Sequence, residues 1–167
     1  MIDVSAALKN QGSIFPFEEA ECYPPTDFRG EELSFDQAQL RGTFFGADET
    51  VSIDARLTVT VHAHCARCLA PVARLMDVSF KADFRRTPDE DSYPIVGHQI
   101  DAGEAAFMAL LSEVPLRFVC REDCRGLCPV CGCNRNISPC TCLEGAAGPS
   151  PFEALAVLLG DQNNEEV

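Results

Sequence analysis

The chain contains no apolar run that approaches the roughly 18 consecutive residues of a membrane-spanning helix. Its first residues, Met1 to Ser5, lack the basic and apolar regions of a secretory signal peptide. A Ser/His/Asp arrangement, a phosphate-binding loop and a pair of clustered carboxylates are also absent, so no motif points to catalysis. These absences predict a soluble cytoplasmic protein that is not an enzyme.

Basic residues are scarce. The 167-residue chain has 13 Lys and Arg residues against 26 Asp and Glu residues, which gives a net charge of −13 at pH 7. Nine of the 13 lie in two cysteine-bearing segments, 65–86 and 115–142. They either offset the negative charge of a thiolate metal centre or form a basic recognition face on an acidic body. The absence of a dense basic run favours the first interpretation.

Cysteine, by contrast, is abundant, with ten residues, seven of them between Cys120 and Cys142. Without an export signal, C-x-x-C pairs favour metal or redox chemistry over a disulfide scaffold. The turn from Cys128 to Gly132 reads C-P-x-C-G. Its proline stiffens the entry, and its glycine permits a positive φ, so that backbone N–H groups can point at sulfur. The segment Cys65–Cys68 repeats the C-x-x-C spacing upstream.

Zinc prefers four ligands in a tetrahedron, usually supplied as two close pairs. Eight thiolates could make two such sites. One would join Cys65/Cys68 to Cys120/Cys124, and the other would join Cys128/Cys131 to Cys140/Cys142. A single site with Cys124, Cys128, Cys131 and either Cys140 or Cys142 also fits. All-sulfur ligation without the cysteine spacing of an iron–sulfur cluster favours zinc over such a cluster. Four thiolates leave no position for water, so the predicted role is structural. The predicted ligand pairs are Cys65/Cys68, Cys120/Cys124, Cys128/Cys131 and Cys140/Cys142, which leaves Cys22 and Cys133 without an assigned role.

Apolar and polar residues alternate over residues 51–65, the pattern of a long, half-buried strand. A second alternation over 76–84 predicts a hairpin whose tip carries the Cys65–Cys68 turn. Residues 38–45 predict a third antiparallel strand.

The rest of the chain predicts a polar loop over 87–99, a helix over 102–114 that Pro115 ends, and the cysteine module. The predicted fold class is α+β, an antiparallel sheet of long strands with a few helices and a C-terminal cysteine-rich zinc-binding module. The predicted domains are a sheet body with one helix (1–118), a metal module fastened to the 65–68 hairpin tip (119–143), a helix (150–160) and an acidic tail (161–167).

The hairpin tip from Cys65 to Val72 reads C-A-R-C-L-A-P-V, and the segment from Cys120 to Gly132 reads C-R-E-D-C-R-G-L-C-P-V-C-G. These motifs resemble C-x-R-C-L-x-P-V and C-x-x-x-C-x-G-L-C-x-x-C-G of the YceD-like family, the large-subunit ribosomal RNA accumulation proteins of bacteria and plastids. Arg135 departs from the family, which usually has an aliphatic residue there; the change adds a positive charge and leaves the metal pairs untouched. The resemblance covers roughly residues 30–160 and includes Asn136, Cys140–Cys142 and Pro151–Leu155.

The resemblance implies a role in accumulation or processing of large-subunit ribosomal RNA without catalytic activity. We therefore expect a zinc-stabilised, non-enzymatic factor in large ribosomal subunit assembly, with no membrane or small-molecule substrate. Because the net charge of −13 opposes phosphate binding, the expected partner is a basic ribosomal protein or an assembly factor. Direct rRNA contact is the alternative, with Arg67, Arg125 and Arg135 as the candidate recognition residues.

Two other functions compete with this expectation. C-x-x-C pairs can form disulfides, and oxidation would free the metal, so a thiol-based redox or zinc-release switch is the first alternative. A nuclease fares worse, because it needs a metal with an open coordination position or an acid–base pair, and neither is visible.

Overall fold

The structure is a computed structural model in which residues 1–142 are described. Backbone contacts group Met1–Cys120 into one compact unit and Arg121–Val167 into a second. The predicted helix over 150–160 and the acidic tail lie outside the described residues, and the predicted domain boundaries stay a prediction.

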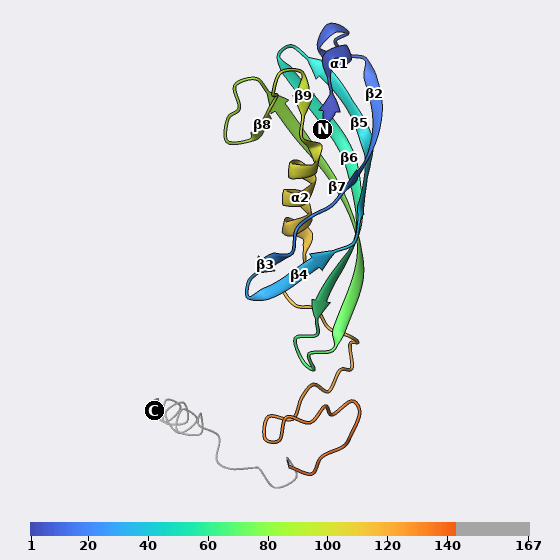
Figure 1. Ribbon diagram of the computed structural model, residues 1–167, viewed down its shortest axis with the longest axis vertical. Coiled ribbons are helices and arrows are strands. Elements are labelled where there is room, and N and C mark those ends of the chain that lie inside the picture. Colours follow the sequence, from blue (N-terminus) through green and yellow to red (C-terminus); the bar gives the residue numbers. More distant parts are fainter. Residues whose placement is uncertain (143–167) are drawn as a thin grey trace, which may run out of the picture. The chain divides into compact units, whose positions relative to one another are not determined.

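A seven-stranded sheet dominates the first unit (Figure 1). Its centre is a hairpin of two 15-residue strands, β6 (Thr50–His64) and β7 (Pro71–Arg85). The two strands pair antiparallel without interruption from Thr50 and Arg85 to His64 and Pro71. The predicted hairpin is confirmed, but β7 begins five residues earlier than the predicted 76, because pairing with β6 continues through residues that lack a clear alternation.

The predicted third strand is also confirmed. It is β5 (Ala38–Ala47), which pairs with the other side of β6. Four further strands complete this sheet, and two short strands form a separate pair. The further strands are β2 (Ile14–Glu21) on β5, β4 (Glu31–Phe35) on β6, β3 (Thr26–Phe28) on β4 and β8 (Ser92–Pro94) on β7; the separate pair is β1 (Ile2–Asp3) with β9 (Gln99–Ile100).

The prediction of a loop over 87–99 is therefore wrong for β8 and part of β9. These strands are two or three residues long, too short to produce a periodic pattern. They form because existing strands offer them pairing partners, a tertiary effect that local sequence does not encode.

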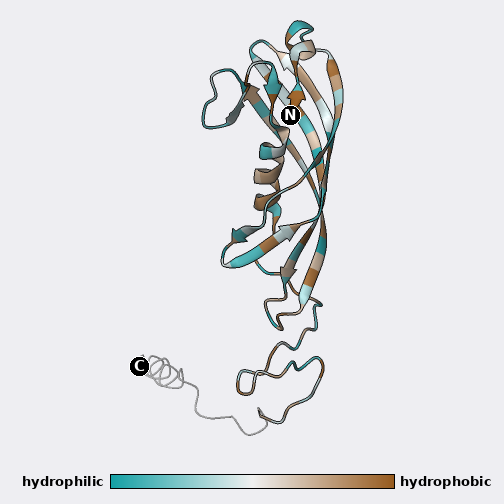
Figure 2. Ribbon diagram, in the orientation of Figure 1, coloured by the Kyte–Doolittle hydropathy of each residue, from teal (hydrophilic) through white to brown (hydrophobic). Residues whose placement is uncertain are grey.

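Alternation of hydropathy along the long strands gives the sheet an apolar and a polar face (Figure 2). Two helices are present in the described residues, α1 (Ser5–Lys9) and α2 (Ala102–Glu113), and α2 packs against β7 and β6. The carboxylate of Asp101 caps α2 by accepting hydrogen bonds from the N–H groups of Gly103 (3.0 Å) and Glu104 (3.2 Å). The predicted helix over 102–114 is thus confirmed.

The core contains no buried polar or charged residue within the described part of the chain. Neither described helix has the length and apolar character needed to cross a bilayer. The prediction of a mostly antiparallel sheet with helices is confirmed. The largest side chains that are fully buried in this core are Phe84, Leu33, Leu40, Ile53, Leu57, Ile100 and Leu110.

Candidate metal centre

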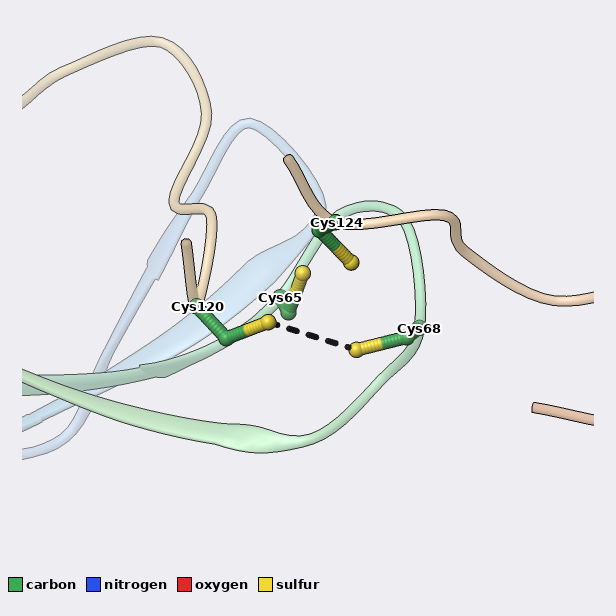
Figure 3. A group of neighbouring side chains, drawn as sticks. All are labelled: Cys65, Cys68, Cys120 and Cys124. Carbon is green, nitrogen blue, oxygen red and sulfur yellow. Dashed lines mark hydrogen bonds between the residues drawn. The ribbon is translucent and has the colours of Figure 1, made fainter. Parts of the chain in front are cut away.

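The first cysteine group consists of Cys65, Cys68, Cys120 and Cys124, whose Sγ atoms lie within 4.8 Å of one another. Figure 3 shows the four thiols pointing toward a common centre. The Sγ atoms of Cys68 and Cys120 are 3.7 Å apart. A tetrahedral metal with bonds to sulfur of about 2.3 Å has sulfur atoms about 3.8 Å apart, whereas a disulfide bond is about 2.0 Å long. The spacing therefore fits a four-thiolate metal site.

The turn after β6 positions the first pair. The N–H of Cys65 donates to the carbonyl of Ala70 (2.8 Å), and the N–H of Leu69 donates to the carbonyl of Cys65 (2.9 Å). In the same turn, the N–H of Ala66 donates to the carbonyl of Phe118 (2.8 Å). This last bond holds the segment that leads to Cys120 against the hairpin tip, so the local fold brings two distant parts of the sequence together.

The second group consists of Cys128, Cys131, Cys140 and Cys142, whose Sγ atoms also lie within 4.8 Å of one another. Its turn closes as the first one does, because the N–H of Gly132 donates to the carbonyl of Cys128 at 2.9 Å. The chain therefore uses one turn geometry twice.

The residue after each C-x-x-C has a positive φ, 59° at Leu69 and 71° at Gly132. Glycine adopts this conformation freely, whereas leucine does so at a cost of about 1 kcal/mol or more. Leu69 is nevertheless 64% exposed, so burial of its side chain does not compensate for the strain.

Backbone N–H groups aimed at sulfur favour thiolates in both groups. Burial raises the pKa of the Cys65 thiol, but the N–H groups of Cys120, Arg67 and Cys68 together lower it to about 6. Those of Cys131 and Val130 lower the pKa of Cys128 to about 6 as well. Two potential ligands are thus ready to bind a cation at neutral pH.

Cys142 of the second group behaves differently. Hydrogen bonding to Cys131, burial and the neighbouring negative charges raise the pKa of Cys142 to about 11. Four thiolates packed this closely repel one another, and a divalent cation is the group that would offset their charge. The donor set and its electrostatics therefore fit a metal ion.

Asn136 connects the first group to the loop that carries the second. Its Nδ2 donates to Sγ of Cys124 (3.4 Å) and to Oδ1 of Asn134 (2.9 Å). Its Oδ1 accepts hydrogen bonds from the N–H of Arg125 and from Nη2 of Arg121, both at 2.8 Å. The sequence points to Asn136 only through the family motif, because hydrogen bonds between side chains leave no periodic signal.

All eight predicted ligands fall into the two groups, four in each, and Cys124 lies with the hairpin pair. Cys22 and Cys133 belong to neither group within the described residues. Hydrogen bonds to the sulfurs of Cys131 and Cys140 raise the pKa of Cys133 to about 12, which keeps it a neutral thiol beside the second group. The candidate recognition residues Arg67 and Arg125 are exposed, and Arg135 is half-buried.

Comparison with known proteins places the chain in a family. The model of the family described as "Large ribosomal RNA subunit accumulation protein YceD" matches residues 53–159, which include both cysteine groups. The chain belongs to the YceD family. The resemblance in the cysteine motifs is therefore confirmed, and the family links this YceD protein to accumulation of large-subunit ribosomal RNA.

Curated relatives come from mycobacteria and are named as uncharacterized proteins. One from Mycobacterium tuberculosis and one from Mycobacterium bovis are each 31% identical over 143 residues, covering 78% of this chain and 68% of the relative. One from Mycobacterium leprae is 33% identical over 106 residues, covering 54% of this chain and 48% of the relative. No solved structure matches the chain.

Proposed function

We propose that this YceD family member is a zinc-stabilised, non-enzymatic factor in assembly of the large ribosomal subunit. The observation that carries the proposal is the family match, which spans both four-cysteine groups. The absence of a catalytic motif from the sequence is consistent with a role through binding.

Zinc is the metal that best suits the two groups. Four thiolates per site and a sulfur–sulfur distance of 3.7 Å agree with tetrahedral zinc. When bound, zinc would supply a closed coordination sphere that fixes the surrounding loops. Cys65, Cys68, Cys120 and Cys124 would hold one ion, and Cys128, Cys131, Cys140 and Cys142 the other.

The partner we propose is a basic ribosomal protein or an assembly factor on the precursor of the large subunit. The net charge of −13 supports a basic partner over exposed rRNA phosphate. Direct rRNA contact through Arg67, Arg125 and Arg135 is the alternative mode of association.

Two measurements test this function. Elemental analysis of protein purified without added metal should find two zinc ions per chain, and an iron–sulfur cluster would instead colour the protein. In a sucrose gradient of a cell extract, the protein should migrate with precursors of the large subunit. Migration of all the protein at the top, with normal levels of large-subunit rRNA in cells that lack it, would contradict an assembly role.

Charge reversal separates the two modes of association. Arg67→Glu, Arg125→Glu and Arg135→Glu should leave co-migration unchanged if a basic protein is the partner. Loss of co-migration in folded, zinc-loaded variants would favour direct rRNA contact through these residues.

A redox or zinc-release switch is the second candidate, supported by the thiolate character of the cysteines. Cys131 is exposed, and N–H and thiol hydrogen bonds from Cys133 lower its pKa. Hydrogen peroxide could oxidise two thiolates to a disulfide, with its two oxygens leaving as water, and thereby release zinc. Thiol titration and zinc release after mild peroxide treatment test the idea; full retention of zinc and thiols would exclude the switch.

A further inference from the structure

The long hairpin leaves one side of β7 open. β7 pairs with β6 over its whole length, but β8 covers its other side only from Asp83 to Arg85. Within residues 1–142, no strand pairs with that side between Pro71 and Ala82. A strand side of this kind presents N–H and C=O groups with which another chain can pair.

Backbone geometry identifies the residues that face the open side. The carbonyl of Arg85 accepts a hydrogen bond from the N–H of Ile95, just after β8, at 2.8 Å. The backbone groups of Arg85 therefore point away from β6. Every second residue of a strand shares this direction, and the register with β6 is uninterrupted, so Lys81 and Ser79 also face the open side. A proline at Ser79 would remove one outward N–H and leave the ladder with β6 intact.

A groove of about 510 Å³ lies beside the open side, between β7, the loop before β8 and α2. We call it the β7 groove. Its size is that of a site for a small ligand or for a few side chains of a peptide. Its lining combines apolar side chains with carboxylates, among them Phe80, Tyr93, Met108, Glu90, Asp91 and Glu104.

The loop is held in a defined shape by Asp89. Its carboxylate accepts hydrogen bonds from Nη1 of Arg85 and Oγ of Ser92, both at 2.6 Å. The ion pair with Arg85 neutralises the charge of Asp89. Glu90 and Asp91 form no ion pair with any described residue, so their charges at the groove are not neutralised.

A third negative charge comes from α2. Glu104 lines the groove together with Tyr93, and its charge adds to burial in raising the pKa of that tyrosine. Lys81 contributes a cation to the lining, but its ammonium group lies 3.1 Å from the carboxylate of Asp54, its partner across the β6–β7 ladder. The groove therefore carries a net negative charge.

We propose that the β7 groove binds an extended, lysine- or arginine-rich segment of a partner protein, which adds to β7 as a strand. Backbone pairing with the open side supplies affinity, and alternate cationic side chains enter the acidic groove along its apolar floor. Nucleic acid is disfavoured because the groove repels phosphate, and a second copy is disfavoured because the chain carries −13 charges. The inference rests on the proposed function and names the surface that the basic ribosomal protein would use.

A peptide-binding experiment tests the inference directly. The probe is a fluorescent peptide of about ten residues, an ordinary strand length, in which lysine and threonine alternate. Fluorescence anisotropy should show binding that weakens with salt. The same peptide N-methylated at every residue should bind at least about tenfold more weakly, because neither of its edges can then donate N–H groups to the backbone ladder. Equal binding of both peptides, or none of either, would overturn the inference.

Variants of the protein give a second test. Ser79→Pro should weaken peptide binding about tenfold or more, whereas Ser79→Thr, which keeps the N–H, should bind like the native protein. Glu90→Gln combined with Asp91→Asn and Glu104→Gln should weaken binding and reduce its salt dependence. Thermal melting establishes that each variant is folded, and the N-methylated peptide tests the same ladder without changing the protein.

Two further results separate this inference from the proposed function. A folded Ser79→Pro variant that still migrates fully with the large-subunit precursor would overturn partner binding at the β7 groove and leave the assembly role intact. Native protein that binds the peptide but never joins the precursor would contradict the assembly role alone. A dimer of the native protein that dissociates in Ser79→Pro would overturn the inference in favour of a second copy.

Discussion

Replacement of Asn136 by alanine should weaken metal binding at the first cysteine group. The substitution removes two donated hydrogen bonds, to Cys124 Sγ and Asn134 Oδ1, and two accepted ones, from Arg125 and Arg121. At about 1 kcal/mol per bond, the four set an upper limit of about 4 kcal/mol, which water at this half-buried site reduces. Residues that hydrogen-bond to metal ligands typically contribute about 10–100-fold in affinity, or about 1.4–2.8 kcal/mol. The two estimates agree, and we expect a loss within that range.

The assay is competition between the zinc-loaded protein and a chromogenic chelator, followed as two successive releases. One release should shift by about 10–100-fold. The other should not, because no hydrogen bond joins the Asn136 side chain to the second group among the described residues. The matched control is Asn10→Ala, which removes one exposed hydrogen bond, from Nδ2 to the carbonyl of Ala6. Release curves for Asn136→Ala that coincide with those of the native protein would refute the reasoning.

Three other substitutions probe the fold and the ligand assignment. Gly42→Ala would place Cβ 2.5 Å from the carbonyl oxygen of Asp54 and 2.7 Å from Cα of Ala55, so denaturant unfolding should show a loss of about 3 kcal/mol; a loss below about 1 kcal/mol would contradict the clash. Burial and then the charge of Glu19 raise the pKa of Glu21, so the charged form of Glu21 destabilises the folded state above that pKa. Glu21→Gln should therefore raise the melting temperature at pH 7 and leave it unchanged below about pH 4. A rise below about pH 4 without one at pH 7 would contradict this reasoning. Cys133→Ser should keep two zinc ions per chain by elemental analysis, and loss of one ion would make Cys133 a ligand.

The sequence predicts structure where one physical pattern dominates a segment. The period of two over residues 51–65 predicts β6 because one face of a sheet must be apolar, and Pro115 predicts the end of α2 because proline cannot continue a helix. The parity of Cys65 also predicts its buried position at the end of that strand.

The local sequence does not predict structure that depends on residues far away in the chain. β8 forms because β7 offers it a side to pair with, and β2 forms because β5 does. The grouping of Cys124 with the hairpin pair is likewise a contact between remote segments, so spacing alone left a one-site alternative open. The role of Asn136 depends on four hydrogen bonds that no local pattern specifies.

The distance in sequence between the two halves of the first cysteine group gives its assembly an order in time. Cys68 and Cys120 are separated by 52 positions, so a ribosome adding about 5–20 residues per second completes the first pair roughly 3–10 s before it reaches Cys120. The second group spans only residues 128–142 and closes a short loop as soon as its last cysteine emerges. During synthesis, the nascent chain therefore presents two of the four thiols of the first group for seconds. A metal ion bound at that stage would have two protein ligands until Cys120 and Cys124 are synthesised.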